Sequence, residues 1–250
     1  MLLPGNDYRA ILFDLFDTLV LFHPQKLPTV MRHGRQVRST APISFPVFHR
    51  YYPAIPFARY QEALIAVSRE IAQEKEETLR EIPSTERFRR LFARLGIPEN
   101  RETVRQREAV LSTHMHTLQQ ATGCPTCHRD LLAQLRARGY RLGLLSNFDH
   151  APTARQLLHR YGLAPLFDVI AISVELGWRK PKAETFLHVV EALGIRPEEG
   201  VFVGDNWKED ILGAAAVGLT PVWINRKGQP VPAERPASLH VIRSLGELLS

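Results

Sequence analysis

The side chains that could do chemistry in this chain stand after short apolar runs, at points where strands would end. They are carboxylates, a hydroxyl and an ammonium group. In an open parallel sheet, ligands bind beyond the carboxyl ends of the strands, so these groups would meet in one crevice. The residues are Asp14 after the run 10–13, Ser146 and Asn147 after the run 141–145, Asp205 after the run 201–203, Asp210 a turn further on, and Lys180 in a loop before a helical pattern.

Such a set suits attack on an anionic substrate. A carboxylate that approaches a phosphoryl group is repelled by its charge, and a hard cation such as Mg²⁺, bound between carboxylates, can cancel that repulsion. Lys180 can pair with both nucleophile and substrate, and Ser146 can hold a phosphoryl oxygen by a hydrogen bond. Asp14 would then form an aspartyl intermediate that water later cleaves.

The elements that must position these groups follow an α/β pattern. From Tyr140 onward, short β-prone runs alternate with helical patterns, which predicts a Rossmann-like parallel sheet between helices. Each predicted helix stops at a glycine, the residue that best tolerates a left-handed C-terminal cap. The predicted strands cover residues 10–13, 141–145, 169–172, 201–203 and 222–224, and the helices cover 129–138, 153–161, 184–193 and 210–217.

The segment between the first strand and the rest of the sheet has a different character. Residues 23–56 contain six prolines, which predict an extended, irregular segment and no convincing strand. Phe57, Tyr60, Leu64, Val67 and Ile71 then recur at spacings of three and four, which is typical of an amphipathic helix. Further helices are expected over 85–95 and 101–120. The layout is an α/β core, residues 1–20 and 124–250, with a helical insertion at 21–123.

Taken in order, four motifs resemble the haloacid dehalogenase-like (HAD) hydrolase superfamily over roughly residues 8–20 and 124–228. The segments 146–149 and 177–181 are most similar to the subgroup of the dehalogenases and the rhythmically-expressed-gene-2-like proteins. The insertion matches only in position, as a helical cap domain. The motifs are Phe13-Asp14-Leu15-Phe16-Asp17-Thr18-Leu19, Leu145-Ser146-Asn147, Arg179-Lys180-Pro181, and Val203-Gly204-Asp205 with Asp210.

The resemblance implies a Mg²⁺-dependent phosphatase acting on a small phosphorylated metabolite. It implies that Asp14 is the nucleophile, that Ser146, Asn147 and Lys180 bind the substrate, and that Lys180 also stabilises the reaction. The implied metal ligands are Asp14, the main-chain carbonyl of Phe16, Asp205 and Asp210. Asp210 has a second interpretation, because an Asp before Ile211 is also well placed to cap a helix.

One position departs from the phosphatase pattern. The phosphatases of the family carry a second Asp two residues after the nucleophile, which protonates the leaving group, whereas this chain has Phe16 there. The dehalogenases also lack that Asp, because a departing halide needs no proton, so a 2-haloacid dehalogenase is an alternative. Asp205 favours the metal-dependent alternative, since a dehalogenase needs no metal. A third possibility is a catalytically weak module that binds a metabolite or a partner.

Composition bounds the remaining classes. The 250 residues are 44% hydrophobic and carry a formal charge of +6, as in ordinary globular proteins, and no run approaches the roughly 18 apolar residues of a membrane span. The arginines are interspersed with acidic residues and form no basic block, so neither nucleic acid nor a membrane is an expected partner. Cys124 and Cys127 are too few for a disulfide framework. We expect a cytoplasmic protein, either a monomer or a homodimer.

Overall fold

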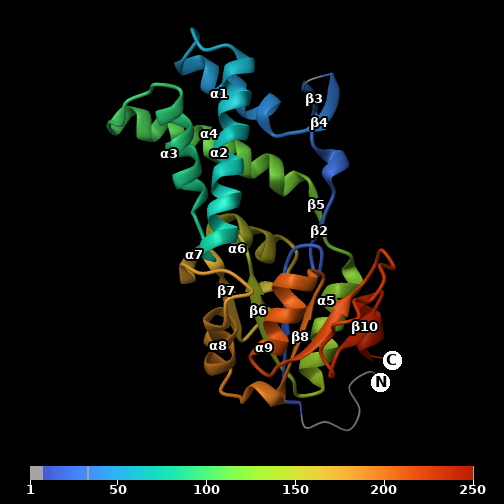
Figure 1. The fold of residues 1–250 in the computed structure, drawn as a ribbon. Coiled ribbons are helices and arrows are strands. Elements are labelled where there is room, and N and C mark those ends of the chain that lie inside the picture. Colours follow the sequence, from blue (N-terminus) through green and yellow to red (C-terminus); the bar gives the residue numbers. More distant parts are fainter. Residues whose placement is uncertain (1–7, 33, 250) are drawn as a thin grey trace. The chain divides into compact units, whose positions relative to one another are not determined.

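The computed structural model describes residues 8–32 and 34–249. The chain divides into two compact units (Figure 1). One contains the chain up to Leu21 and from Gly123 onward, and the other is Phe22–Thr122. At the boundary, β2 (Leu21–Phe22) and β5 (Thr122–Gly123) pair as a two-stranded sheet, so the two linkers run together. No helix in the described ranges is both long and apolar enough to cross a bilayer.

The first unit is built on a six-stranded sheet of order β10-β9-β8-β1-β6-β7. Its neighbouring strands are parallel (Figure 1), which confirms the predicted α/β, Rossmann-like fold class. The last strand, β10, was outside the predicted set. The strands are β1 (Ala10–Phe13), β6 (Arg141–Ser146), β7 (Val169–Ile172), β8 (Gly200–Gly204), β9 (Thr220–Ile224) and β10 (His240–Ile242).

Helices cover both faces of this sheet. Successive side chains of β1 point to opposite faces, and both sets are apolar and buried. Ile11 and Phe13 are buried on one face with side chains of α5, α6 and the C-terminal turn, whereas Ala10 and Leu12 are buried on the other with those of α8 and α9. The helices are α5 (Thr126–Ala137), α6 (Ala151–Arg160), α7 (Ser173–Leu176), α8 (Ala183–Ala192) and α9 (Gly213–Ala216), with 3-10 turns at Ala164–Leu166, Pro197–Glu199 and Leu245–Leu249.

The register of the central strand brings three loops together. Phe13 of β1 is level with Leu144 of β6 and with Val203 of β8. The pairing extends one residue further, because the Asp14 amide donates to the Val203 carbonyl oxygen at 2.9 Å. The residues that follow these three strands therefore leave the sheet side by side.

Among the residues that the structure describes, the second unit contains four α-helices. Tyr60 is fully buried, its ring lies 4.8 Å from that of Phe48, and its hydroxyl is 2.9 Å from Ser44 Oγ. Phe48 also contacts Phe92 at 5.6 Å, so three of the helices share one aromatic core. The helices are α1 (Ala41–Tyr51), α2 (Phe57–Thr78), α3 (Ser84–Arg94) and α4 (Arg101–Gln120), in the places that the sequence predicts for the last three.

The expectation of an irregular segment over 23–56 was wrong. This stretch forms a short turn (Pro24–Lys26), an antiparallel hairpin of β3 (Thr29–Arg32) and β4 (Arg35–Arg38), and helix α1. The prolines permit this because most stand at element boundaries. Pro42 lies in the first turn of α1, where an amide hydrogen has no helical partner, and only Pro46 lies inside the helix.

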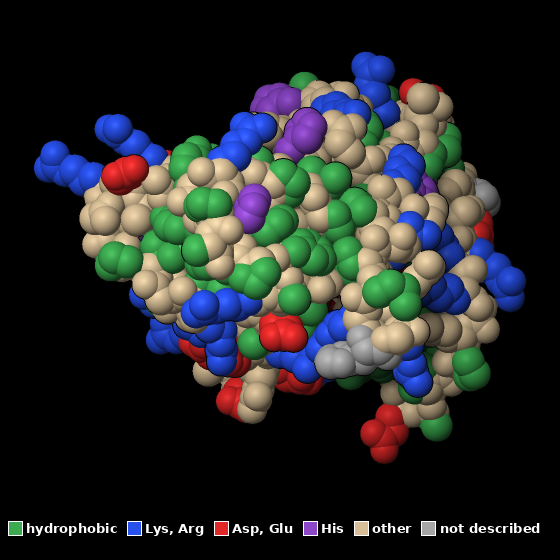
Figure 2. Space-filling view, turned by 90° about the horizontal axis from the view of Figure 1, so that it is seen from above, with side chains coloured by type: hydrophobic (Ala, Val, Ile, Leu, Met, Phe, Trp, Pro, Cys, Tyr) green, Lys and Arg blue, Asp and Glu red, His purple; other side chains and the backbone are tan. Residues whose placement is uncertain are grey.

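Figure 2 shows one face of the molecule, on which hydrophobic side chains lie among basic side chains (Lys or Arg) and histidines. The most exposed large apolar side chains of the second unit are Met31, Ile43 and Tyr51. Single exposed apolar side chains are common on protein surfaces and identify no partner by themselves.

Candidate active site

Lys180 forms the centre of a buried charge cluster. It lies in the loop between α7 and α8 and is 1% exposed. Its Nζ donates to Asp14 Oδ1 at 2.8 Å and to Asp210 Oδ1 at 2.7 Å. Asp14 follows β1 and Asp210 follows β8, so the lysine contacts side chains from two segments that are separate from its own loop.

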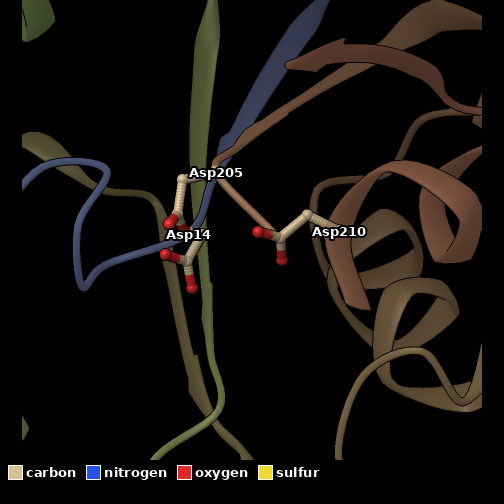
Figure 3. Close-up of side chains that lie close together, drawn as sticks. All are labelled: Asp14, Asp205 and Asp210. Carbon is tan, nitrogen blue, oxygen red and sulfur yellow. The ribbon is translucent and has the colours of Figure 1, made fainter. Parts of the chain in front are cut away.

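Three carboxylates gather at the same place. Asp14, Asp205 and Asp210 each offer an oxygen, and these oxygens all lie within 4.8 Å of one another. Figure 3 shows Asp14 and Asp205 next to each other and Asp210 facing them across a gap. Carboxylate oxygens at this spacing are the ligand set that a hard divalent cation such as Mg²⁺ prefers.

Burial makes the carboxyl groups of Asp14 and Asp205 costly to ionise. It raises the pKa of Asp14 from 3.8 to about 7; Lys180 opposes the rise, while Asp210 and Asp205 add to it. Burial, together with Asp210 and Asp17, raises the pKa of Asp205 to about 6. For Lys180, burial alone would lower the pKa, but its two carboxylate partners hold it above the usual value. Counting the three carboxylates and the lysine, the site carries a net charge of −2 when ionised, and a bound cation would offset that charge.

Ser146 carries a buried hydroxyl group that has no hydrogen-bond partner among the described residues. Ser146 is the last residue of β6, the strand next to β1, and its Oγ atom is fully buried. A buried polar atom that is left unpaired lowers the free energy of unfolding by about 1–3 kcal/mol. Most such atoms in native proteins are therefore paired with protein groups, ligands or water. The hydroxyl is therefore suited to hold an oxygen of a bound anion.

A π-helical turn, Trp207–Leu212, presents Asp210 to the cluster. This differs from the helix predicted from Asp210 onward. The N-cap is Asn206, whose Oδ1 accepts from the Glu209 amide at 3.0 Å, and Asp210 Oδ2 accepts from the Asn206 amide at 2.9 Å. Asp210 is therefore not the N-cap residue, and its other oxygen, Oδ1, faces Lys180.

Asn147 stands beside the cluster, but its side chain is occupied within the protein. Its Nδ2 donates to the Lys180 carbonyl and to Glu209, and its Oδ1 accepts from the Lys180 amide. The contact with substrate that the resemblance implies for Asn147 stays a prediction, since these bonds use both amide hydrogens. The bonds themselves give the side chain a second role, in holding Lys180.

Phe16 occupies the place of the missing acid. Its ring is half-buried and lies 4.7 Å from the ring of Phe148, which follows Ser146 by two residues. The structure therefore places an aromatic pair after two of the site strands. Coordination of a metal by the Phe16 carbonyl oxygen stays a prediction.

Sequence reasoning missed two residues that hold the site loops. Arg226, after β9, donates to the main-chain carbonyl oxygens of Asp17 and Thr18 in the loop that follows Asp14. Glu209 accepts from Asn147 and from Arg179. Only its position before Asp210 could have drawn attention to Glu209, and no local pattern distinguishes Arg226 from the other arginines of the chain.

Comparison with protein-family models identifies the family of this chain. The family model described as a hydrolase, haloacid dehalogenase-like hydrolase, matches residues 8–218. The chain belongs to the haloacid dehalogenase-like hydrolases. The four motifs that suggested this resemblance all lie within the matched residues.

Curated HAD-like relatives of the chain include phosphatases. The phosphoserine phosphatase of Thermus thermophilus is 38% identical over 110 residues, 44% of this chain and 44% of that protein. The glyceraldehyde 3-phosphate phosphatase of Pyrococcus furiosus is 28% identical over 220 residues, 86% of this chain and 80% of that protein. The chain spans less than half the length of the curated relatives that it matches at 36 to 38% identity.

A solved structure extends the likeness to the whole fold. The 2-haloacid dehalogenase from Pseudomonas syringae pv. tomato DC3000 superposes with a TM-score of 0.73 and covers 97% of this chain and 96% of its own. At 21% identity this match shows a shared HAD-like fold and leaves the reaction to be argued from the site.

Proposed function

We propose that this HAD-like hydrolase is a Mg²⁺-dependent phosphatase that acts on a small phosphorylated metabolite, with Asp14 as the nucleophile. The observation that carries the proposal is the cluster of Asp14, Asp205 and Asp210, with Lys180 bonded to Asp14, together with the buried, unpaired hydroxyl of Ser146 at the end of the neighbouring strand β6. Displacement at a phosphoryl group needs a nucleophile, positive charge and a hydrogen-bond donor. In this proposal Asp14, Lys180 and Ser146 supply them, respectively.

The donor set fits a magnesium ion. Asp14, Asp205 and Asp210 would hold it, since hard cations take carboxylate oxygens and since the raised pKa values of Asp14 and Asp205 show how costly these charges are alone. When bound, the ion supplies positive charge that offsets the repulsion between the Asp14 carboxylate and the phosphoryl oxygens.

The residues of the chain perform the remaining tasks. Lys180 orients Asp14 through the 2.8 Å bond and offers its charge to the phosphoryl group, while Ser146 donates to a phosphoryl oxygen. Asp14 attacks phosphorus, the bond to the leaving oxygen breaks, and water later cleaves the aspartyl phosphate. We infer that the second unit is the cap that selects the substrate.

The aromatic ring of Phe16 limits which leaving groups depart easily. A general acid typically contributes about 10²–10⁴-fold, and a phenyl ring transfers no proton. We therefore expect aryl phosphates, whose leaving groups need no proton, to be hydrolysed much faster than alkyl phosphates. Phe16→Asp should raise kcat/KM for an alkyl phosphate by at least about tenfold, because it supplies an acid.

The same variant should change hydrolysis of 4-nitrophenyl phosphate by less than about threefold, since that leaving group gains little from an acid. Phe148→Leu, which alters the other ring of the pair without adding an acid, is the control and should not favour alkyl phosphates. Equal gains on both substrates in the Phe16 variant would contradict this role of Phe16.

The dehalogenase alternative rests on Phe16, and Asp205 weighs against it. A third, half-buried carboxylate near Asp14 is costly without a cation, and halide displacement needs none. A panel assay separates the alternatives. Phosphate release that requires added Mg²⁺ supports the phosphatase, halide release from a 2-haloacid in EDTA supports the dehalogenase, and tight binding of a panel compound without turnover supports a binding module.

Gly204 tests the metal site independently of turnover. A Cβ at this position would lie 2.4 Å from Asp210 Oδ2 and 2.5 Å from Asp210 Cβ, so an alanine must displace Asp210. We expect Gly204→Ala to weaken Mg²⁺ binding, measured by titration calorimetry, by at least about tenfold, within the 10–100-fold range typical when groups supporting a metal ligand are lost.

Gly246→Ala is the matched control, because a Cβ there meets only an ordinary contact at 3.8 Å, with Ser244 Oγ. Its Mg²⁺ affinity should equal that of the wild type. An unchanged affinity in a folded Gly204→Ala protein would remove Asp210 from the proposed ligand set.

A further inference from the structure

A hydrogen-bonded network joins the loops that follow β6, β7 and β8. At its centre, the side-chain amide of Asn147 makes two hydrogen bonds to the main chain of Lys180. Asn147 Nδ2 donates to the Lys180 carbonyl oxygen at 3.0 Å, and the Lys180 amide donates to Asn147 Oδ1 at 2.8 Å. Two bonds fix both the place and the direction of this peptide segment, from which the buried Lys180 side chain must reach Asp14.

Glu209 accepts hydrogen bonds from Asn147 and from Arg179, the residue before Lys180. Its Oε2 accepts from Asn147 Nδ2 at 3.0 Å, and its Oε1 accepts from Arg179 Nη2 at 2.8 Å. Asn147 is the residue after Ser146, and Arg179 is the residue before Lys180. One carboxylate therefore holds the neighbours of two proposed catalytic side chains.

Glu209 is itself fixed by the turn that carries Asp210. Its amide donates to Asn206 Oδ1 at 3.0 Å, and Asp210 is the next residue. Both Glu209 and Arg179 are about three-quarters covered, with side-chain exposures of 28% and 21%. Hydrogen bonds between charged groups at these distances are strong and direction-dependent, so the network resists sliding of one loop against another.

We propose that Glu209 is a positioning residue, which sets Lys180 between Asp14 and Asp210 by orienting the Asn147 amide and Arg179. This proposal rests on the proposed phosphatase function for its kinetic consequence. The orientation matters because Nδ2 of Asn147 faces two acceptors, Glu209 and the Lys180 carbonyl, which leaves Oδ1 for the Lys180 amide.

The substitution Glu209→Gln breaks this arrangement while preserving size. Glutamine has one acceptor oxygen and one NH₂ donor at its end, and both partners of Glu209 are donors. One of them, Arg179 or Asn147, must then face another donor. Glu209 is not buried in an apolar core, so the variant should fold.

A purely structural pair would behave differently. Partly exposed ion pairs contribute little to stability, and losing one would leave kcat unchanged. Misplacing a catalytic group by about 1 Å can cost about 10²-fold in rate. We therefore expect Glu209→Gln to lower kcat for 4-nitrophenyl phosphate with Mg²⁺ by about 10- to 100-fold, with KM changed by less than about threefold.

Glu175→Gln is the matched control. Glu175 also accepts two hydrogen bonds, both from Arg155, at 2.8 and 3.1 Å, but it is 38% exposed and neither bond involves a residue of the network. The kcat of Glu175→Gln should equal that of the wild type, and the melting temperatures of both variants should lie within about 4 °C of the wild-type value, as expected for the loss of a weak, partly exposed ion pair. A wild-type kcat in Glu209→Gln, or equal losses in both variants, overturns the proposal.

Two further measurements keep the proposal testable. If Glu209→Gln does not fold, Arg179→Gln removes the other charge of the pair, and the same fall in kcat is expected; a wild-type kcat there overturns the proposal. If the wild type hydrolyses no phosphate ester, the proposed function fails, and a crystal structure of Glu209→Gln then tests positioning alone. Displacement of Lys180 Nζ from Asp14 supports the proposal, and an unchanged contact of 2.8 Å overturns it.

Discussion

Replacing Asp14 by asparagine should lower kcat for an aryl phosphate by at least about 10⁴-fold. An amide cannot act as the nucleophile, and removing the nucleophile of an enzyme that works through a covalent intermediate costs about 10⁶-fold in a well-measured case. Steady-state release of phosphate in saturating Mg²⁺ is the measurement. Asp14→Ala serves beside it, because asparagine can deamidate back to aspartate.

The control for Asp14 is Asp17→Asn, in the same motif. Asp17 is exposed and has a left-handed backbone, with φ of 55°, which asparagine tolerates well. We expect its kcat to fall by less than about tenfold, because the Asp17 side chain is exposed and is not one of the three clustered carboxylates. Abolished turnover in the Asp17 variant, with turnover kept in the Asp14 variants, would contradict the assignment of the nucleophile.

The Asp14 substitution should not unfold the protein. The folded state holds the Asp14 proton up to a pKa of about 7, whereas the unfolded chain releases it near 3.8. Ionisation of Asp14 therefore lowers the free energy of unfolding as pH rises through this interval. Without metal at pH 8, Asp14→Asn removes that cost, so its melting temperature should be at least equal to that of the wild type.

Replacing Lys180 by methionine should have the largest effect on stability. It removes the cation that contacts Asp14 and Asp210 and leaves three carboxylates together, two of them almost fully buried. Breaking a buried ion pair by removing one partner typically costs about 3–5 kcal/mol. We expect a loss of that size in the free energy of unfolding at pH 8 in EDTA, measured by urea denaturation.

The loss should depend on pH with a definite sign. Asp14 and Asp205 have folded-state pKa values of about 7 and 6, both above the value of 3.8 for an unperturbed carboxyl group. At pH 5 both are largely protonated in the folded protein, so removal of Lys180 leaves less uncompensated charge. The loss should therefore be smaller at pH 5 and grow as pH rises toward 8.

Lys182→Met is the matched control for Lys180. Lys182 pairs with Glu184 at 3.1 Å on the surface, and the side chain of Glu184 is 63% exposed. Such a surface pair contributes little to stability, so the variant should unfold close to the wild type at both pH values. Equal losses at pH 5 and pH 8 in Lys180→Met would show that lost packing, rather than uncompensated charge, causes its effect.

The sequence by itself determined the parallel core and the membership of its motifs in one family. Buried strands such as 10–13 and helices that end at glycines are local patterns, and local patterns can be recognised along the chain. Asp14, Ser146 and Asp205 could be chosen because each follows a strand whose neighbours in a parallel sheet end at the same edge.

Only the tertiary structure decided which polar groups meet and which remain unpaired. The 2.8 Å contact of Lys180 with Asp14, separated by 166 positions, depends on sheet order, and so does the unpaired hydroxyl of Ser146. Glu209 also depends on tertiary structure, because nothing in its local sequence shows that Asn147 and Arg179 will face it. Segment 23–56 shows the same limit, since its prolines exclude one long helix but leave a hairpin and a short helix open.

The physical reason is the range of the interactions. Strand and helix patterns arise from contacts within a few residues, so they can be inferred along the chain. The charge balance of a buried cluster is a sum over groups from distant loops, and it is set only when packing excludes water and brings those loops together.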